Sequence, residues 1–187
     1  EGGFADLTMD DLAQAVGVSK PTLYQHFKGK DDLTARVIID YICEIEEHLR
    51  STCEDAPLER LKAVLRSMLV QRYGADSLLA DYENETVFAM FRSHPEVVTA
   101  KKRLMSQINQ VVEQGKVSGE ITATTPTPLV GCLLFKMLGM PATLQALASE
   151  SERLVKPGAR EELVEAVVTL FERSIADIQL SDTGKGC

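Results

Sequence analysis

The sequence lacks an apolar run long enough to cross a bilayer. Its most apolar stretch runs from Leu129 to Met140 and includes the charged Lys136. A spanning helix needs about 20 consecutive, mostly apolar residues. No signal peptide is recognisable at the N-terminal end either. We therefore expect a cytoplasmic protein without a membrane partner.

Cysteine and histidine are scarce, with four and three residues in a chain of 187. They form no CxxC pair and no spacing typical of metal ligands, so we expect neither a metal nor a cofactor. Cys43 and Cys132 lie in apolar helical patterns, which predicts inert core positions. Cys53 has no clear basic neighbour, so a redox role for its thiol is not favoured.

Catalytic constellations and basic residues are also lacking. No Ser-His-acid, Cys-His, paired-carboxylate or phosphate-loop arrangement occurs, so we expect no enzyme. Lys and Arg number 20 against 28 Asp and Glu, a net charge of −8 that argues against nucleic-acid binding by the whole surface. The balance differs locally between Ser19 and Arg36, where two acids, Asp31 and Asp32, accompany four basic residues: Lys20, Lys28, Lys30 and Arg36.

A short helix is predicted just before this locally basic segment. Thr8 can cap it, and Asp10 and Asp11 then lie in the first turn, where the helix dipole favours negative charge. Helical spacing gives it one apolar face, made of Met9, Leu12, Ala13 and Val16. Gly17 can end the helix in the left-handed conformation, and Val18 is expected to turn inward.

A second short helix follows the glycine turn. Ser19 can cap it, Pro21 is tolerated in its first turn, and Leu23 and Phe27 face the core. The outward or rim positions hold groups that bond to phosphates and base edges: Lys20, Thr22, Tyr24, Gln25 and His26. This pattern favours a DNA-reading helix-turn-helix, although a plain helical hairpin with a polar face has the same spacing.

The residues of this region resemble the N-terminal signature of TetR-type transcriptional repressors. The resemblance covers about a fifth of the chain. It is carried by Gly3-Phe4, Leu7-Thr8-Met9, Leu12-Ala13, Val16-Gly17-Val18-Ser19, Thr22-Leu23-Tyr24, His26-Phe27 and Lys30-Asp31-Asp32-Leu33. It implies a homodimer whose recognition helices enter successive major grooves of a palindromic operator, and a divergent helical domain that binds a small inducer.

The same resemblance implies the fold and its division. We expect an all-α fold, with an N-terminal helix-turn-helix DNA-binding domain and a C-terminal helical domain for ligand binding and dimerisation. The first domain, with its connecting helix, is predicted over residues 1–50 and the second over 51–180, followed by a disordered tail at 181–187.

Individual DNA contacts carry over from the family by position. Phosphate contacts are implied for Thr8, Tyr24 and Lys30, with His26 close to the backbone. Positions that approach bases are Lys20, Pro21, Thr22 and Gln25. Lysine pairs with guanine and glutamine with adenine, whereas Pro21 and the Thr22 methyl can touch a thymine methyl. Ser19 completes the predicted DNA-binding set.

One departure from the family concerns the start of the chain. The family has a further helix before the Gly3-Phe4 pair, and it completes a three-helix core. This chain begins at Glu1. We therefore expect the segment as given to expose Leu12, Val16 and Phe27 and to bind DNA poorly by itself.

Helical patterns continue through the remaining sequence. A long helix is predicted from Lys30 to about Arg50, followed by helices near 58–73 and 77–92. Ser93 and Glu96 read as a capping box that opens a helix ending near Gly115. On it, residues 101–103 form a basic run that we assign to a solvated face.

Two further helices complete the prediction. Residues 129–140 are apolar on nearly every side, which predicts burial all round. A last helix is expected at about 159–178. The family resemblance makes these two helices the candidate dimer interface, whereas from the residues alone they can equally close the core of a monomer.

An inducer pocket is predicted among the middle helices. Its candidate residues are methionines, aromatics and one polar neighbour: Met68, Tyr73, Tyr82, Asn84, Phe88, Phe91 and Met105. Met and aromatic residues at helical spacing also fit an ordinary core. The chain is accordingly interpreted as a repressor released by a small apolar or amphipathic inducer. The alternative is a helical small-molecule-binding or adaptor protein that keeps the helix-turn-helix shape without operator recognition.

Overall fold

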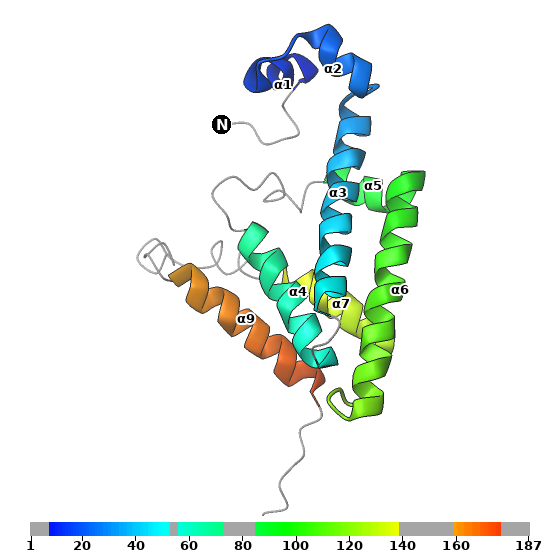
Figure 1. Ribbon diagram of the computed structural model, residues 1–187, viewed down its shortest axis with the longest axis vertical. Helices are drawn as coiled ribbons and strands as arrows, with labels where there is room; N and C mark the ends of the chain where they lie inside the picture. Colours follow the sequence, from blue (N-terminus) through cyan, green and yellow to red (C-terminus); the bar gives the residue numbers. More distant parts are fainter. Residues whose placement is uncertain (1–7, 53–55, 73–84, 139–158, 177–187) are drawn as a thin grey trace, which may run out of the picture. The chain divides into compact units, whose positions relative to one another are not determined.

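The computed structural model describes residues 8–52, 56–72, 85–138 and 159–176, and within them every element is a helix (Figure 1). The predicted all-α class is confirmed. The helices are α1 (Met9–Val16), α2 (Lys20–His26), α3 (Lys30–Ser51), α4 (Pro57–Arg72), α5 (Glu85–Ser93), α6 (Pro95–Ser118), α7 (Thr127–Met137) and α9 (Ala159–Ile175).

The chain divides into two compact units. One comprises residues 1–47 and 72–105, and the other comprises 48–71 and 106–187. Helices α3 and α6 each contribute residues to both units. The functional boundary expected at residue 50 stays a prediction, and the expected tail at 181–187 lies outside the described residues.

Helix α3 buries an apolar stripe along its length. Its buried members recur at helical spacing: Ile38, Tyr41, Ile42, Ile45 and Leu49. Glu46 is also buried, at 5% exposure. Arg103 of α6 donates to its two carboxylate oxygens from Nε and Nη2, each at 2.7 Å. A buried carboxylate needs such pairing, because burying an unpaired charge is costly.

This pair corrects the interpretation of residues 101–103 as a merely solvated face. Arg103 holds Glu46, and Lys101 Nζ donates to the Phe91 carbonyl oxygen at 2.6 Å. Both cations therefore join elements of the first unit. The sequence spacing gave no sign of partners 57 and 10 residues away.

In the second unit, α4 supplies much of the core. Its most deeply buried residues include four that are all at 1% exposure or less: Leu61, Leu65, Met68 and Leu69. Two ion pairs link α4 to α9. Arg66 donates to the two Glu165 carboxylate oxygens at 2.5 and 2.8 Å, and Lys62 lies 3.1 Å from Glu172. Phe171 of α9 is fully buried.

Helix α6 continues to Ser118, slightly beyond the end predicted near Gly115. The glycine serves close packing. A Cβ there would lie 2.6 Å from Ile121 Cδ1, and the Gly115 carbonyl accepts from the Ile121 backbone N–H at 3.0 Å. Thr122 N then donates to the Ile175 carbonyl oxygen, which ties this turn to the end of α9.

The capping box predicted at Ser93 is wrong. Ser93 is the last residue of α5, and its hydroxyl donates backwards to the Ala89 carbonyl oxygen at 2.8 Å. Helix α6 begins at Pro95, whose fixed φ suits a first helical turn.

Burial all round α7 is not observed within the chain. Val130, Leu134 and Met137 are buried, but Leu129 is 48% exposed and Cys132 is exposed. Cys43 is exposed as well, so the prediction of core positions for both cysteines is wrong. Helix α7 thus has one side that packs inside the unit, against α9 among others, and one side that does not.

Among the described residues, no helix is both long and apolar enough to traverse a bilayer. Cys53 lies outside them, as does the first part of the helix predicted at 77–92.

Candidate nucleic-acid interface

Helix α1 begins with a reciprocal cap. The Thr8 hydroxyl accepts from Asp11 N at 3.2 Å, and Asp11 Oδ2 accepts from Thr8 N at 2.8 Å. The hydroxyl of Thr8 also donates to the same carboxylate, at 2.6 Å. These bonds favour the charged form and lower the pKa of Asp11. Thr8 is exposed, yet its hydroxyl is already bonded to Asp11 in the unliganded chain.

The turn between α1 and α2 depends on Gly17. Its φ of 71° lies in the left-handed region, and its N–H donates to the Gln14 carbonyl oxygen at 3.2 Å. Ser19 then caps α2 by accepting from Thr22 N at 3.3 Å, with Pro21 in the first turn. The predicted helix–glycine turn–helix geometry is therefore confirmed, with Gly17 at the turn and Ser19 at the second cap.

A small apolar cluster fixes α2 against α1. Met9, Ala13 and Leu23 are buried in it, and Leu12, Phe27 and Leu33 pack around them half-buried. Ala13 is 4% exposed, as a small side chain at a close helix crossing should be. Val16 and Val18 are 66% and 40% exposed, so Val18 does not turn inward. Two helices this short bury too little surface to cover both valines.

Helix α2 presents its polar side chains outward. Lys20, Pro21, Tyr24, Gln25 and His26 are exposed. Thr22 is half-buried, and its hydroxyl lies 2.7 Å from that of Ser19. Leu23 at the opposite side anchors the helix in the cluster. The chain therefore offers an amide, an imidazole, a phenol and an ammonium on one short helix, which packs on α1 through Leu23.

Lys20 is already engaged by an acid of α1. Its Nζ donates to Asp10 Oδ2 at 2.8 Å, and this bond raises the pKa of the ammonium. Both side chains are more than half exposed. The sequence reasoning assigned Asp10 only to the helix dipole and missed this contact, because it depends on the crossing of α1 and α2.

The start of α3 borders this face. Lys28 N donates to Asp32 Oδ2 at 2.8 Å, which fixes the loop before the helix. Lys30 is half-buried at the first position of α3, where free backbone N–H groups suit an anion. Thr8, Lys30 and the α2 residues all belong to the first unit, and their contacts with DNA stay predictions.

The predicted inducer residues are only partly described. Met68 is buried in the second unit, whereas Phe91 and Met105 are half-buried in the first. Tyr73, Tyr82 and Asn84 lie outside the described residues, and Phe88 lies in α5 without a described side chain. No group of three or more His, Cys, Asp or Glu side chains in the described ranges could hold a metal ion.

Comparisons with known proteins agree with this geometry. Residues 1–37 match the family of bacterial regulatory proteins called the tetR family. The chain is 35% identical over 83 residues to the HTH-type transcriptional regulator YvaF of Bacillus subtilis strain 168. The aligned residues make up 44% of this chain and 43% of that protein. It is 21% identical to the repressor DhaR of Mycobacterium sp. strain GP1, over 65% and 63% of the two chains.

The chain spans between about two fifths and two thirds of the length of such relatives. Solved structures share its fold over more of its length. The fatty acid degradation regulator FadR from Bacillus halodurans has a TM-score of 0.71, at 19% identity over 92% of this chain and 87% of that one. FadR from Bacillus subtilis, solved with stearoyl-CoA, has a TM-score of 0.65 at 20% identity, over 89% and 90%. The N-terminal segment is therefore similar to the tetR family of regulatory proteins, and these solved structures share the helical fold of the chain.

Proposed function

We propose that this protein is a ligand-responsive repressor that binds a palindromic operator as a homodimer and leaves it when a small apolar or amphipathic inducer binds. The observation that carries the proposal is the exposed polar face of α2. It is held by the Met9, Ala13 and Leu23 cluster inside a segment that matches a family of DNA-binding regulators. Its relatives are named as regulators, and the absence of enzyme activity stays a prediction.

The exposed residues of α2 support distinct roles. Gln25 carries a donor and an acceptor, as bidentate pairing to adenine requires. Tyr24 and His26 lie on the same helix and fit phosphate contacts. Lys20 needs a change of partner, because DNA has to compete with Asp10 for its ammonium. Base reading by Lys20 therefore includes the loss of one exposed ion pair.

A homodimer is supported by apolar surface on two packed helices. Leu129 of α7 and Leu170 of α9 are 48% and 47% exposed, and Leu133 and Phe135 of α7 are half-buried. Large apolar side chains that remain exposed on adjacent elements are typical of interfaces. A second copy of the chain can cover both helices in a closed, symmetric contact.

The inducer is the least constrained part of the proposal. FadR from Bacillus subtilis binds stearoyl-CoA in its solved structure, an amphipathic molecule. A ligand of that general kind agrees with the methionine and aromatic residues predicted for the pocket. Release would follow if the ligand favours a head spacing that no longer fits two half-sites about one helical turn apart.

The test is the binding of the full-length protein to short palindromic DNA, selected from a random library, over a series of salt concentrations. A repressor prefers the selected palindrome over random DNA by a factor of about 10³ or more. Its affinity falls steeply with salt, because phosphate contacts release counterions.

The second candidate is an adaptor or small-molecule-binding protein without operator recognition. The net charge of −8 and the Asp10–Lys20 pair favour it, since both reduce the positive potential that DNA requires. It predicts equal, weak binding to selected and random DNA in the same experiment, and that result would reject the repressor.

A further inference from the structure

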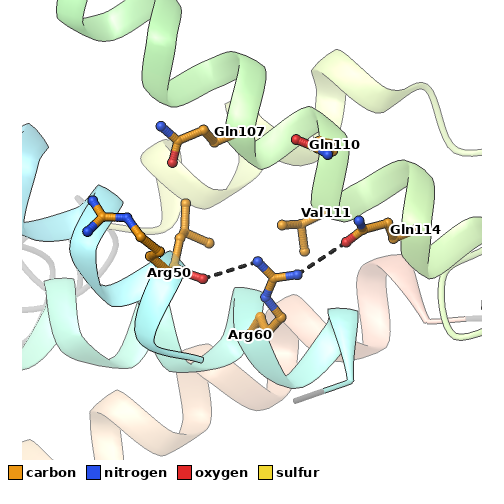
Figure 2. A pocket seen from close by; sticks show the side chains of 7 residues that line it. Arg50, Arg60, Gln107, Gln110, Val111 and Gln114 are labelled. Carbon is orange, nitrogen blue, oxygen red and sulfur yellow. Dashed lines mark hydrogen bonds between the residues drawn. The ribbon is translucent and has the colours of Figure 1, made fainter. Parts of the chain in front are cut away.

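A pocket of about 400 Å³ lies in the second unit, between the end of α3, the start of α4 and the middle of α6 (Figure 2). This volume falls within the range of small-molecule sites. The lining residues are Leu49, Arg50, Arg60, Gln107, Gln110, Val111 and Gln114. It shares no residue with the methionine and aromatic set predicted for an inducer.

The lining has a clear chemical bias. Two of its side chains are guanidinium groups, three are amides, and none is a carboxylate. Leu49 and Val111, at 2% and 3% exposure, are its buried apolar members. A positive lining of this kind stands out in a chain with a net charge of −8.

Arg60 is held in the pocket by neutral groups. Nη1 donates to Gln114 Oε1 and Nη2 donates to the Leu49 carbonyl oxygen, each at 3.1 Å (Figure 2). Its Nε is buried and has no acceptor among the described residues. Guanidinium has five N–H donors and a fixed charge, and buried donors without acceptors are destabilising. Within the described part of the chain, the hydrogen bonds that fix Arg60 thus run to neutral acceptors.

We propose that this pocket binds a small organic anion, whose carboxylate or phosphate group pairs with Arg60. Guanidinium groups match the planar or forked oxygens of such anions. Gln107 and Gln110 come from α6, across the pocket from α3 and α4, and their amides can bond to the polar groups of the ligand (Figure 2). The proposal concerns binding alone and does not rest on operator recognition.

Titration calorimetry on the full-length protein tests it with four probes: inorganic phosphate, succinate, octanoate and the neutral octanamide. At least one of the three anions is expected to bind. Binding of phosphate or succinate identifies a free small oxyanion as the ligand class. Binding of octanoate alone identifies the acid head of an amphipathic molecule, and octanamide then binds about tenfold or more weakly.

The decisive variant is Gln114→Glu. A carboxylate there keeps an acceptor for Arg60, so the helices stay joined, but it neutralises the guanidinium and repels an anion. Affinity for the bound anion is expected to fall about tenfold or more. Gln110→Glu, at an exposed rim position, provides a second variant whose folding is not in question.

Lys102→Gln is the matched control, because it makes the same change of charge at an exposed position of α6 that does not line the pocket. It should leave anion affinity within about twofold. The proposal is overturned if no anion binds at millimolar concentration, if octanamide binds as well as octanoate, or if Gln114→Glu and Gln110→Glu bind the anion as tightly as the unaltered protein.

Discussion

At the scale of single residues, the Asp10–Lys20 pair is expected to weaken the proposed contact of α2 with DNA. The 2.8 Å bond joins a side chain of α1 to the first residue of α2, and both groups remain in solvent. Exposed pairs of this kind are weak, so DNA can displace the carboxylate. The pair therefore lowers affinity slightly without blocking the face.

Asp10→Asn is expected to tighten binding to DNA about two- to fivefold, because Lys20 no longer has a competing anion. Fluorescence anisotropy with a labelled duplex measures it. Asp40→Asn is the control, since it removes the acid of another exposed pair, with Arg36, on α3. Equal affinities for the two variants would contradict the role given to Asp10.

A second prediction at the residue scale concerns the left-handed backbone conformation of Gly17. Its φ of 71° is strained for any residue with a Cβ, although the space around it is open. Gly17→Ala should lower the free energy of unfolding by roughly 1 kcal/mol. Gly29→Ala offers the comparison, because Gly29 has equal space and no such φ. Urea denaturation that gives the same loss for both would remove the conformational explanation.

At the scale of elements, local signals and tertiary contacts differ in how far sequence predicts them. The turn at Gly17, the cap at Ser19 and the buried Leu23 were predictable, because each depends on neighbours within one or two turns. The Glu46–Arg103 pair was not, since its partners are 57 residues apart. The close packing of Ile121 against Gly115 inside α6 was not predictable either, because it depends on the turn that follows the helix.

The α4–α9 contact yields a pH-dependent prediction. The Arg66 guanidinium holds the pKa of Glu165 below its ordinary 4.5. The stabilisation that this ion pair gives the fold is therefore complete above about pH 4.5. It is lost as the pH falls through the lower pKa that Glu165 has in the folded protein. Glu165→Gln should cost less than about 1 kcal/mol at neutral pH, because the pair is half exposed.

The cost of Glu165→Gln should also shrink as the pH falls below 4.5, in chemical unfolding measured across pH. Glu162→Gln, the same change on α9 outside this pair, serves as the control. If the loss in the free energy of unfolding caused by Glu165→Gln grows on acidification, the lowered pKa of Glu165 is contradicted.

The exposed apolar side chains of α7 and α9 predict that the protein forms a dimer through these two helices. Leu170→Glu adds a charge to a position that is 47% exposed in the single chain, so the protomer should fold. In a dimer the charge would be buried, at a cost of several kcal/mol. We expect sedimentation at micromolar concentration to show a dimer for the unaltered protein and a monomer for the variant.

Val117→Glu is the matched control, because Val117 is 89% exposed on α6, outside both helices. It should remain dimeric. An unaltered protein that sediments as a monomer, or a Leu170→Glu variant that stays dimeric, would contradict the proposed interface.

At the scale of the whole molecule, the two proposed binding sites belong to different units. The α2 face lies in the first unit and the arginine pocket in the second, while the chain as a whole carries −8. The sequence predicted the first because family positions and local helix signals coincide there. It did not predict the pocket, since Arg60 is brought to α6 only by folding.

The central claim is that α2 reads DNA through its exposed side chains, with Gln25 in a base contact. Its most direct test compares the sequences selected from random DNA by the full-length protein, by Gln25→Ala and by Gln14→Ala, a matched change on the exposed surface of α1. We predict a palindrome for the unaltered protein and for Gln14→Ala, and loss of preference at one base pair of each half-site for Gln25→Ala. Preference that Gln25→Ala leaves unchanged at every position would contradict it.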